Sequence, residues 1–436
     1  MAQVQPFRAF RYDPEKIAAS HVVTQPYDKI TPTMQDGYYA ASPHNLVRLI
    51  LGRREETDDA HRNVYSRAAE YLSEWRASGI LRQDSEPSIY VYSQSFMAPG
   101  SSTELERRGF IALGRIEDYS AGVVFRHEQT LAKPKADRLE LLRATHAHFG
   151  QIFVLYEDSG QVESLLKIDV NPDAELSDEY AVKHRLWRVG DPRLVQSVQD
   201  AMKDKKLIIA DGHHRYETAL NYRNECRAKN GAQEGQSAMA PSEFVMMTFV
   251  NMNSPGLHIL PTHRVVHSLD SFSAEEFRKP AQKYFDMDEV DSSLSADYAR
   301  AILRESGRAG STILAVTSSQ AFLLHHCDFN AAARLFASVS VRQQALDVVQ
   351  LHKCLLEGVL SLSEESIRNQ QNLSYVRDAA EALAQVREGR ANIAFLMNPC
   401  RITQVRDIAF SGEVMPQKST DFYPKMLSGL TIYALD

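Results

Sequence analysis

The chain has 436 residues, more than a single hydrophobic core usually holds, so two or three folding units are expected. Hydrophobic residues make up 44% and charged residues 24%, a balance that excludes disordered and fibrous proteins. The net charge of −7 and the pI of about 6.1 argue against a nucleic-acid-binding protein, which would carry a basic face.

The 4 cysteines are widely scattered and form no CxxC pair, which favours a reducing compartment over a disulfide framework. The N-terminus lacks the apolar core of a signal peptide, and no apolar run approaches the ~18 residues of a membrane span. We therefore expect a cytoplasmic protein without membrane contact. The sequence leaves the oligomeric state open.

Residues 1–155 are expected to form an N-terminal α/β domain. Helical spacing of apolar residues predicts a helix over 58–79, with acids at its start and a glycine at its end. Two β-rich runs around a polar loop, 88–96 and 109–115, predict a pair of strands. We also expect strands over 123–125 and 151–156 and a charged helix from Pro134 to Phe149.

Residues 156–270 are expected to form a central domain. A strand over 182–188 precedes a helix that begins at Asp191-Pro192, and an apolar strand covers 244–250. Between them, the run KKLIIADGHHRYETAL (205–220) predicts a buried strand, a glycine turn and a helix.

Residues 271–436 are expected to form a C-terminal α+β domain. We interpret 286–289 as an acidic loop, 341–360 as one long helix with an apolar stripe, and 375–387 as another helix. The other elements expected here are a helix over 297–305 and strands over 312–316, 321–325, 392–397 and 430–435. The whole chain is therefore assigned to the α/β class, as a mixed α+β fold with mixed sheets.

The turn after the buried strand has the composition of an anion site. The first N–H groups of a helix point into such a turn, and Gly212 lets a ligand approach the backbone closely. His213, His214 and Arg215 add donors where a helix start usually prefers acids. The alternative is a plain strand-to-helix turn that Asp211 caps, with solvated histidines.

Two further clusters combine a guanidinium with an imidazole. Arg126, His127 and Glu128 follow a short strand, where a phosphate fork, a titratable ring and a carboxylate suit a general-base or metal site. The alternative is the ion-paired edge of a surface strand. His263 and Arg264 have similar content with less support.

A C-terminal loop carries another group of donors. Lys418, Ser419, Thr420 and Lys425 can donate to phosphate oxygens, and a stiff loop beside a strand holds donors in fixed positions. We expect this loop to complete the site of the Gly212 turn. A solvated lysine loop is the alternative.

Other nucleotide and metal motifs are missing or incomplete. No GxGxxG occurs, and although Gly412 lies at P-loop spacing from Lys418, Gln417 replaces the second glycine. Neighbouring histidines in a turn point apart, so the pair His213-His214 predicts no zinc site. The pair His325-His326 follows an apolar run, and we interpret it as the end of a strand.

Several segments resemble a known family. The run ADGHHRYETAL resembles the hallmark of domain-of-unknown-function family 1015, which is widespread in bacteria and archaea. Segments that match this family in order are QPFRAFRY, VVTQPYDKI, SPHNLVRL, RRGFIALGRIED, RHEQTLAKPKADRLELL, IFVLYED, LPTHRVV and MPQKSTDFYPKMLSGL. Tyr27, Asp28 and Asn45 become candidate substrate-binding residues through this resemblance and through the polar turns that hold them.

The DGHHR turn is also similar to the phosphate-contacting motif of the ParB/sulfiredoxin superfamily, which includes partition proteins, sulfiredoxin and free serine kinases. This resemblance implies a ParB/sulfiredoxin-like nucleotide-binding core with additional α+β units. Sulfiredoxin has its reactive cysteine where this chain has His213, so cysteine-based repair is not expected. The resemblance makes free serine or phosphoserine a candidate substrate.

Basic clusters on an acidic protein favour a pocket for a small phosphorylated molecule, and phosphoryl transfer is the chemistry that fits best. We predict a nucleotide-dependent phosphotransferase that uses ATP or ADP with Mg²⁺ and acts on a small hydroxyl-bearing metabolite. The predicted roles fall into four groups. The predicted catalytic residues are Asp211, His213 and Glu128, and Mg²⁺ is expected at Asp211 or Glu128. The predicted phosphate-binding residues are Gly212, His214, Arg215, Arg126, His127, Lys418, Ser419 and Thr420. The predicted substrate-binding residues are Tyr27, Asp28, Asn45, His263, Arg264 and Lys425. The alternatives are a nucleotide-binding regulatory protein without turnover and a phosphatase of a small metabolite.

Overall fold

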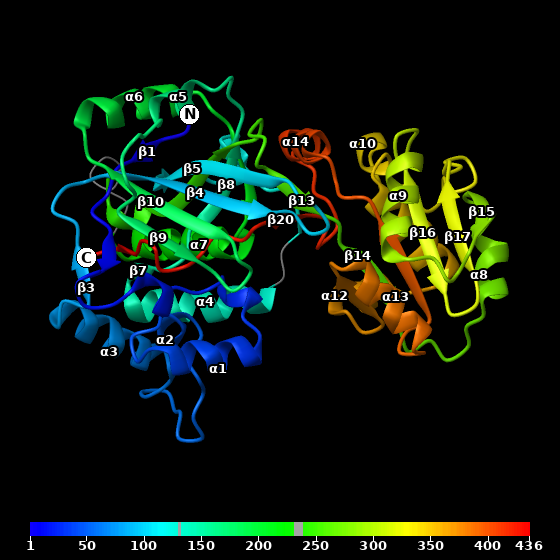
Figure 1. Cartoon of the computed structure of the whole chain (residues 1–436), viewed down its shortest axis with the longest axis horizontal. Coiled ribbons are helices and arrows are strands. Elements are labelled where there is room, and N and C mark those ends of the chain that lie inside the picture. Colours follow the sequence, from blue (N-terminus) through cyan, green and yellow to red (C-terminus); the bar gives the residue numbers. More distant parts are fainter. Residues whose placement is uncertain (130–131, 231–238) are drawn as a thin grey trace. The chain divides into compact units, whose positions relative to one another are not determined.

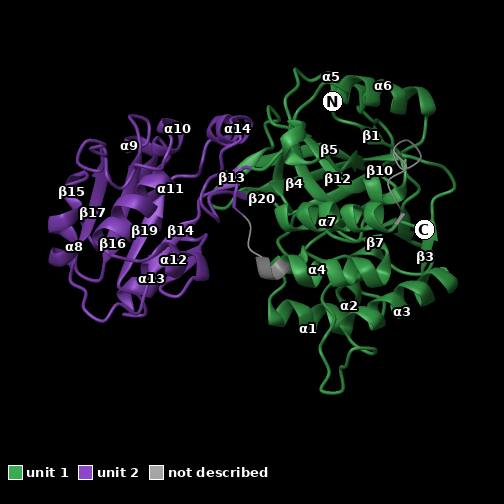
Figure 2. Ribbon diagram, turned by 180° about the vertical axis from the view of Figure 1, so that it is seen from behind, with its two compact units in different colours: residues 1–126, 130–258, 422–436 green, residues 127–129, 259–421 purple. Residues whose placement is uncertain are grey.

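The computed structural model of the chain describes residues 1–129, 132–230 and 239–436. The chain forms two compact units (Figure 2). Unit 1 consists of residues 1–126, 130–258 and 422–436, and unit 2 of residues 127–129 and 259–421. The boundary expected at 155/156 falls within a strand of unit 1, and the division into three folding domains stays a prediction.

Unit 1 contains a large mixed sheet and several helices (Figure 1). Its helices are α1 (Pro32–Ala41), α2 (Val47–Ile50), α3 (Val64–Ala77), α4 (Ala132–Thr145), α5 (Gln161–Leu165), α6 (Pro192–Met202) and α7 (His213–Asn230). Its strands are β1 (Val4–Gln5), β2 (Phe10–Tyr12), β3 (Leu81–Gln83), β4 (Ile89–Met97), β5 (Glu104–Arg115), β6 (Val124–Phe125), β7 (Ala147–His148), β8 (Ile152–Tyr156), β9 (Ala174–Ser177), β10 (Lys183–Val189), β11 (Leu207–Asp211), β12 (Phe244–Asn251) and β21 (Tyr433–Ala434).

The nine-stranded sheet has the order β6-β11-β8-β12-β5-β4-β10-β9, with β1 beside β5. The pairs β6/β11 and β8/β12 are parallel and the others antiparallel, which confirms the predicted mixed sheet. Every residue of β12 is buried, as expected of a continuous apolar run in a central strand. Strands β4 and β5 pair with each other, as predicted.

The helices of unit 1 follow local capping signals. Asp191 caps α6 as predicted, accepting a hydrogen bond from the N–H of Arg193. Helix α3 begins at Val64 rather than near Asp58, because Asn63 supplies a capping box there. Asp59 instead accepts N–H groups of the preceding loop. Helix α4 packs between α3 and α7.

Unit 2 has a six-stranded antiparallel sheet in the order β15-β17-β16-β19-β14-β18. Its strands are β14 (His263–Val266), β15 (Asp286–Val290), β16 (Thr312–Thr317), β17 (Ala321–His325), β18 (Leu373–Val376) and β19 (Ile393–Met397). Its helices are α8 (Ala274–Ala281), α9 (Ala296–Ser306), α10 (Val341–Gln344), α11 (Asp347–Gln350), a π-helix (Leu351–Val359), α12 (Glu364–Asn369), α13 (Ala379–Arg387) and α14 (Ile402–Phe410). Two short strands, β13 (His258–Leu260) and β20 (Asp421–Tyr423), lie where the chain passes from one unit to the other.

Three expectations for unit 2 are wrong. The residues expected as an acidic loop form the edge strand β15, because their backbone pairs with β17 while their charges face solvent. The helix expected over 341–360 breaks at Leu346, which is buried with an extended backbone. The helix expected from Tyr375 begins only at Ala379, where Asp378 caps it, and the preceding residues form β18.

No helix in the part of the chain that the structure describes is long and apolar enough to cross a membrane.

Candidate functional site

Strand β11, the turn at Gly212 and helix α7 follow one another as the sequence predicts. Gly212 has a φ of +91°, a conformation that side chains disfavour. A Cβ atom at Gly212 would lie 3.1 Å from the guanidinium of Arg215, which covers this side of the turn. The Gly212 N–H donates to Asp211 Oδ1 at 2.9 Å, and the Gly212 carbonyl accepts the first helical N–H, from Tyr216. The positive φ therefore requires glycine here, and a Cβ atom would also push the Arg215 guanidinium aside.

Positive charges converge on Asp211. Its Oδ2 lies 3.7 Å from Nη2 of Arg215 and 3.7 Å from Nζ of Lys425, ion-pair distances longer than hydrogen bonds. Burial acts to raise the pKa of Asp211, but the charges of Lys425, Arg215, Lys29 and His213 outweigh it and hold this pKa well below its usual range. Asp211 is therefore ionised at neutral pH, and it is a weaker general base than an ordinary carboxylate.

The sheet explains how distant segments reach this turn. Since β8 runs antiparallel to β11, the start of β8 lies beside the end of β11, and Arg215 donates to the carbonyl of Gln151. The segment that carries Lys425 is held by Gln94, whose Nε2 donates to the Lys425 carbonyl at 2.8 Å. Arg107 donates to the carbonyl of Tyr423 in the same segment at 3.2 Å.

Arg107 is a further cation of this cluster that the sequence prediction missed. Its side chain is buried, with the guanidinium 4.8 Å from the ring centroid of Phe153. Burial lowers the pKa of Arg107 to about 10, although the charges of Tyr92 and Asp211 act to raise it. The sequence prediction also missed Lys29 and Arg138. All three residues, Arg107 included, lie in segments that resemble the family, and their basic side chains in those segments were the signal that could have pointed to them.

A small pocket of about 60 Å³ opens beside Arg215. Tyr27, Arg138, Gly150 and Ser428 are among its lining residues, and the Arg138 guanidinium lies 4.2 Å from the centroid of the Tyr27 ring. Burial raises the pKa of Tyr27, as does the neighbouring charge of Asp28, against the opposing charges of Arg138 and Arg215. Ligand pockets usually measure about 300–1,000 Å³. This pocket therefore has room for one small group of a ligand.

Arg126 and Asn45 have defined neighbours in unit 1. Strand β6 is parallel to β11 and delivers Arg126 toward α7, where its Nη1 lies 3.9 Å from Glu217 Oε1. Glu217 also pairs with Lys135 at 2.6 Å. Asn45 is buried, and its amide donates to the His21 carbonyl at 2.8 Å and accepts the Val47 N–H at 2.9 Å. These backbone contacts give Asn45 a role in holding the start of α2.

A second cluster lies in unit 2, where residues 127–129 run beside the C-terminal loop. His127 Nε2 is hydrogen-bonded to Thr420 Oγ1 at 2.8 Å, and Glu128 Oε1 accepts the N–H of Lys418 at 2.5 Å. The Met415 N–H donates to the His127 carbonyl at 2.8 Å. Residues almost three hundred positions apart are thus joined.

The backbone of this loop is fixed by buried groups. Arg264 is 1% exposed, lies 5.2 Å from the Tyr375 ring centroid, and donates to the Lys418 carbonyl at 3.1 Å. The hydroxyl of Ser419 donates to the Pro416 carbonyl at 2.6 Å. The Lys418 side chain itself is exposed, and its φ is +59°. Strand β20 follows the loop directly, at the place where a P-loop would continue as a helix.

The predicted site residues thus fall into two sets. The set in unit 1 is Tyr27, Asp28, Asn45, Arg126, Asp211, Gly212, His213, His214, Arg215 and Lys425; the set in unit 2 is His127, Glu128, His263, Arg264, Lys418, Ser419 and Thr420. That both sets serve one site stays a prediction.

Known structures show a loose likeness to this fold. "SbnI with C-terminal truncation from Staphylococcus aureus" is 9% identical, with a TM-score of 0.36 over 73% of this chain and 87% of that one. "Free serine kinase in complex with AMP" is 12% identical, with a TM-score of 0.35 over 70% of this chain and 88% of that one. A conserved hypothetical protein from Pyrococcus furiosus is 12% identical, with a TM-score of 0.33 over 69% and 86%.

No curated protein matches the chain. The family model described as "Protein of unknown function (DUF1015)" matches residues 4–349, which include the DGHHR turn. The C-terminal block MPQKSTDFYPKMLSGL lies beyond the matched range. The match spans most of the chain, and the protein therefore belongs to the DUF1015 family.

Proposed function

We propose that the chain binds a nucleoside di- or triphosphate at the Gly212 turn and transfers a phosphoryl group to a small hydroxyl-bearing metabolite, with free serine as the first candidate. The observation that carries this proposal is the convergence of Arg215, Lys425 and Lys29 on a helix start at a glycine turn. Such a cluster offers fixed donors and positive charge to phosphate oxygens.

Each residue has a role that follows from its position. Gly212 lets a phosphate reach the backbone at the start of α7, and Arg215 offers a planar fork beside it. Lys425 and Lys29 balance the charge of the nucleotide, and His213 and His214 add ring donors. Phosphoryl transfer depends mainly on positioning and charge stabilisation, so no strong base is required.

Asp211 suits the binding of Mg²⁺ better than proton abstraction. Its depressed pKa keeps the carboxylate charged, and a hard oxygen ligand of this kind is what Mg²⁺ selects. One carboxylate fills one of six positions, so phosphate oxygens and water would complete the coordination. Asp211 would hold the ion, and the ion would supply positive charge that stabilises the phosphate groups. The assignment of Glu128 as a catalytic residue stays a prediction.

The test is product formation by the purified full chain, followed by ³¹P NMR. With Mg²⁺, ATP or ADP and free serine, we expect phosphoserine, and Arg215→Lys should lower kcat/KM by at least about tenfold because the fork is lost. Arg227→Lys is the matched control, since Arg227 lies on the same helix but pairs with Glu243. Its activity should stay within about twofold of the wild type.

Other outcomes identify the alternatives. Nucleotide-dependent thermal stabilisation without product from serine or other small hydroxyl compounds would indicate a regulatory protein. Release of inorganic phosphate from phosphoserine without added nucleotide would indicate a phosphatase. If millimolar nucleotide gives no thermal shift, the proposed phosphate site is wrong.

A further inference from the structure

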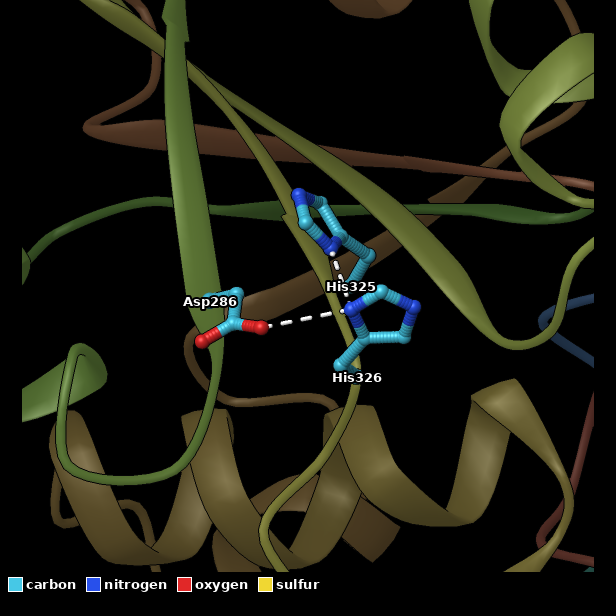
Figure 3. Close-up of side chains that lie close together, drawn as sticks. All are labelled: Asp286, His325 and His326. Atoms are coloured by element: carbon cyan, nitrogen blue, oxygen red, sulfur yellow. Dashed lines mark hydrogen bonds and ion pairs between the residues drawn. The ribbon is translucent and has the colours of Figure 1, made fainter.

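A cluster of metal-ligating side chains lies in unit 2, where strand β15 begins and strand β17 ends. Asp286 pairs with His325 across these antiparallel strands, and His326 follows in a left-handed conformation with a φ of +50°. This conformation turns the His326 ring toward the other two side chains (Figure 3). The candidate ligand atoms of Asp286, His325 and His326 all lie within 4.8 Å of one another.

The distances within the cluster fit a metal ion. Nδ1 of His325 lies 3.1 Å from Nδ1 of His326, which lies 3.2 Å from Oδ2 of Asp286. Two nitrogen ligands of tetrahedral Zn²⁺ are separated by about 3.3 Å, given Zn–N bonds of about 2.0–2.1 Å. Small side-chain rotations would therefore bring the three atoms around one ion.

Asp288 fixes the orientation of one ligand. Its Oδ2 accepts a hydrogen bond from Nε2 of His325 at 2.9 Å, so the proton of the neutral ring is on Nε2. Nδ1 of His325 must then present its lone pair to His326 and Asp286. A carboxylate behind a ligating histidine is the arrangement found around protein-bound zinc.

We propose that Asp286, His325 and His326 bind one divalent transition-metal ion of the Zn²⁺ type, with Asp288 as a positioning residue. Two imidazoles and one carboxylate favour Zn²⁺, Co²⁺ or Ni²⁺ over Mg²⁺ and Ca²⁺, which prefer oxygen ligands. When the ion binds, the Nδ1 proton of His326 moves to Nε2 of the same ring. Water takes the fourth position, because three protein ligands leave it open. The Asp286 and His326 side chains are 70% and 67% exposed, so the ion has direct access.

The test is calorimetric titration of the chelator-treated full chain with ZnCl₂. We expect one equivalent of Zn²⁺ to bind. His325→Ala, His326→Ala and Asp286→Asn should each lower the zinc affinity by at least about tenfold, and MgCl₂ should show no binding. Glu289→Gln is the matched control, because it removes a charge from the same strand on the opposite face and should leave zinc affinity unchanged. Asp286, His326 and Glu289 are exposed and His325 is partly exposed, so thermal melting should show the variants folded.

Asp288 needs a readout beyond affinity. In ¹⁵N NMR of the metal-free protein, Asp288→Ala removes the acceptor and should lower the fraction of His325 rings that carry the proton on Nε2. Asp288→Glu should restore that fraction and part of the zinc affinity. Absence of a zinc equivalent, or an equivalent unchanged in both histidine variants, would overturn the site. An unchanged His325 tautomer in Asp288→Ala would overturn the role of Asp288. Neither result bears on phosphoryl transfer, which is assayed separately.

Discussion

At the scale of single residues, His263 links the stability of unit 2 to pH. The ring is 2% exposed, and its Nδ1 accepts the Met397 N–H at 3.2 Å. Burial, with the charge of Arg264, lowers the pKa of His263 to about 4 from an ordinary value near 6.5. The folded state therefore requires the neutral ring.

We predict that unit 2 loses stability as the pH falls from about 6.5 to about 4, since only the unfolded chain takes up the proton in this window. Above about 6.5 the contribution is complete, and at pH 4 the loss from this group reaches about 3 kcal/mol. Hydrogen exchange of β14 and β19 measures the effect. His263→Asn keeps an acceptor but cannot be protonated, so its pH slope should be shallower; an equal slope would contradict this account.

At the scale of elements, the sequence predicts best where local signals agree. Strand β11 and helix α7 could be predicted, because a continuous apolar run ends at a glycine that only a turn accommodates. Strand β15 could not, since its acidic side chains are typical of a loop and only pairing with β17 explains it. The helix break at Leu346 could not be predicted, because Leu346 fits the apolar stripe of one long helix although its backbone is extended.

The candidate site divides in the same way. Arg215 could be identified because it follows directly on the glycine turn. Arg107 could not be singled out, because it is one of two adjacent arginines in an ordinary strand, and only the fold brings it to Tyr423 in the segment that carries Lys425. The acidic strand β15 concealed the Asp286 cluster for a similar reason: residues 286 and 325 meet only through strand pairing.

Glycine also governs how closely strands approach each other. A Cβ atom at Gly109 of β5 would lie 2.3 Å from the Phe249 carbonyl oxygen of β12, a backbone atom that cannot move aside. We predict that Gly109→Ala lowers the free energy of unfolding of unit 1 by at least about 2 kcal/mol. Gly37→Ala is the control, because no atom lies within 4 Å of its Cβ position in helix α1, where alanine should stabilise by about 0.5–1 kcal/mol. Urea denaturation followed by tryptophan fluorescence tests the pair.

At the scale of the whole molecule, unit 1 depends on the last residues of the chain. Ile432 is fully buried and exchanges backbone hydrogen bonds with Phe10, and Ser428 does the same with Thr24. We predict that a chain ending at Asp421 loses the cooperative unfolding of unit 1 while unit 2 keeps its sheet. Both tryptophans, Trp75 and Trp187, lie in unit 1, so their fluorescence reports on that unit alone.

Hydrogen exchange of β16 and β19 reports on unit 2 in the same truncated chain. Protection there should match that of the full chain, whereas β5 and β12 should lose theirs. Restored tryptophan fluorescence on addition of a synthetic peptide of residues 422–436 would assign the loss to the missing segment. A truncated chain with an unchanged unit 1 transition would contradict the prediction.

This dependence gives the protein an order of events during its synthesis. The ribosome releases the chain from the N-terminus, so residues 259–421 emerge while unit 1 still lacks its last segment. Unit 2 can complete its sheet first, although most of unit 1 was made before it. Lys425 can reach Asp211 only after residues 259–421 have been synthesised. A nascent chain that has not reached residue 425 therefore lacks the Lys425 contact with Asp211, and the phosphate site proposed above would be completed only after unit 2 has been made.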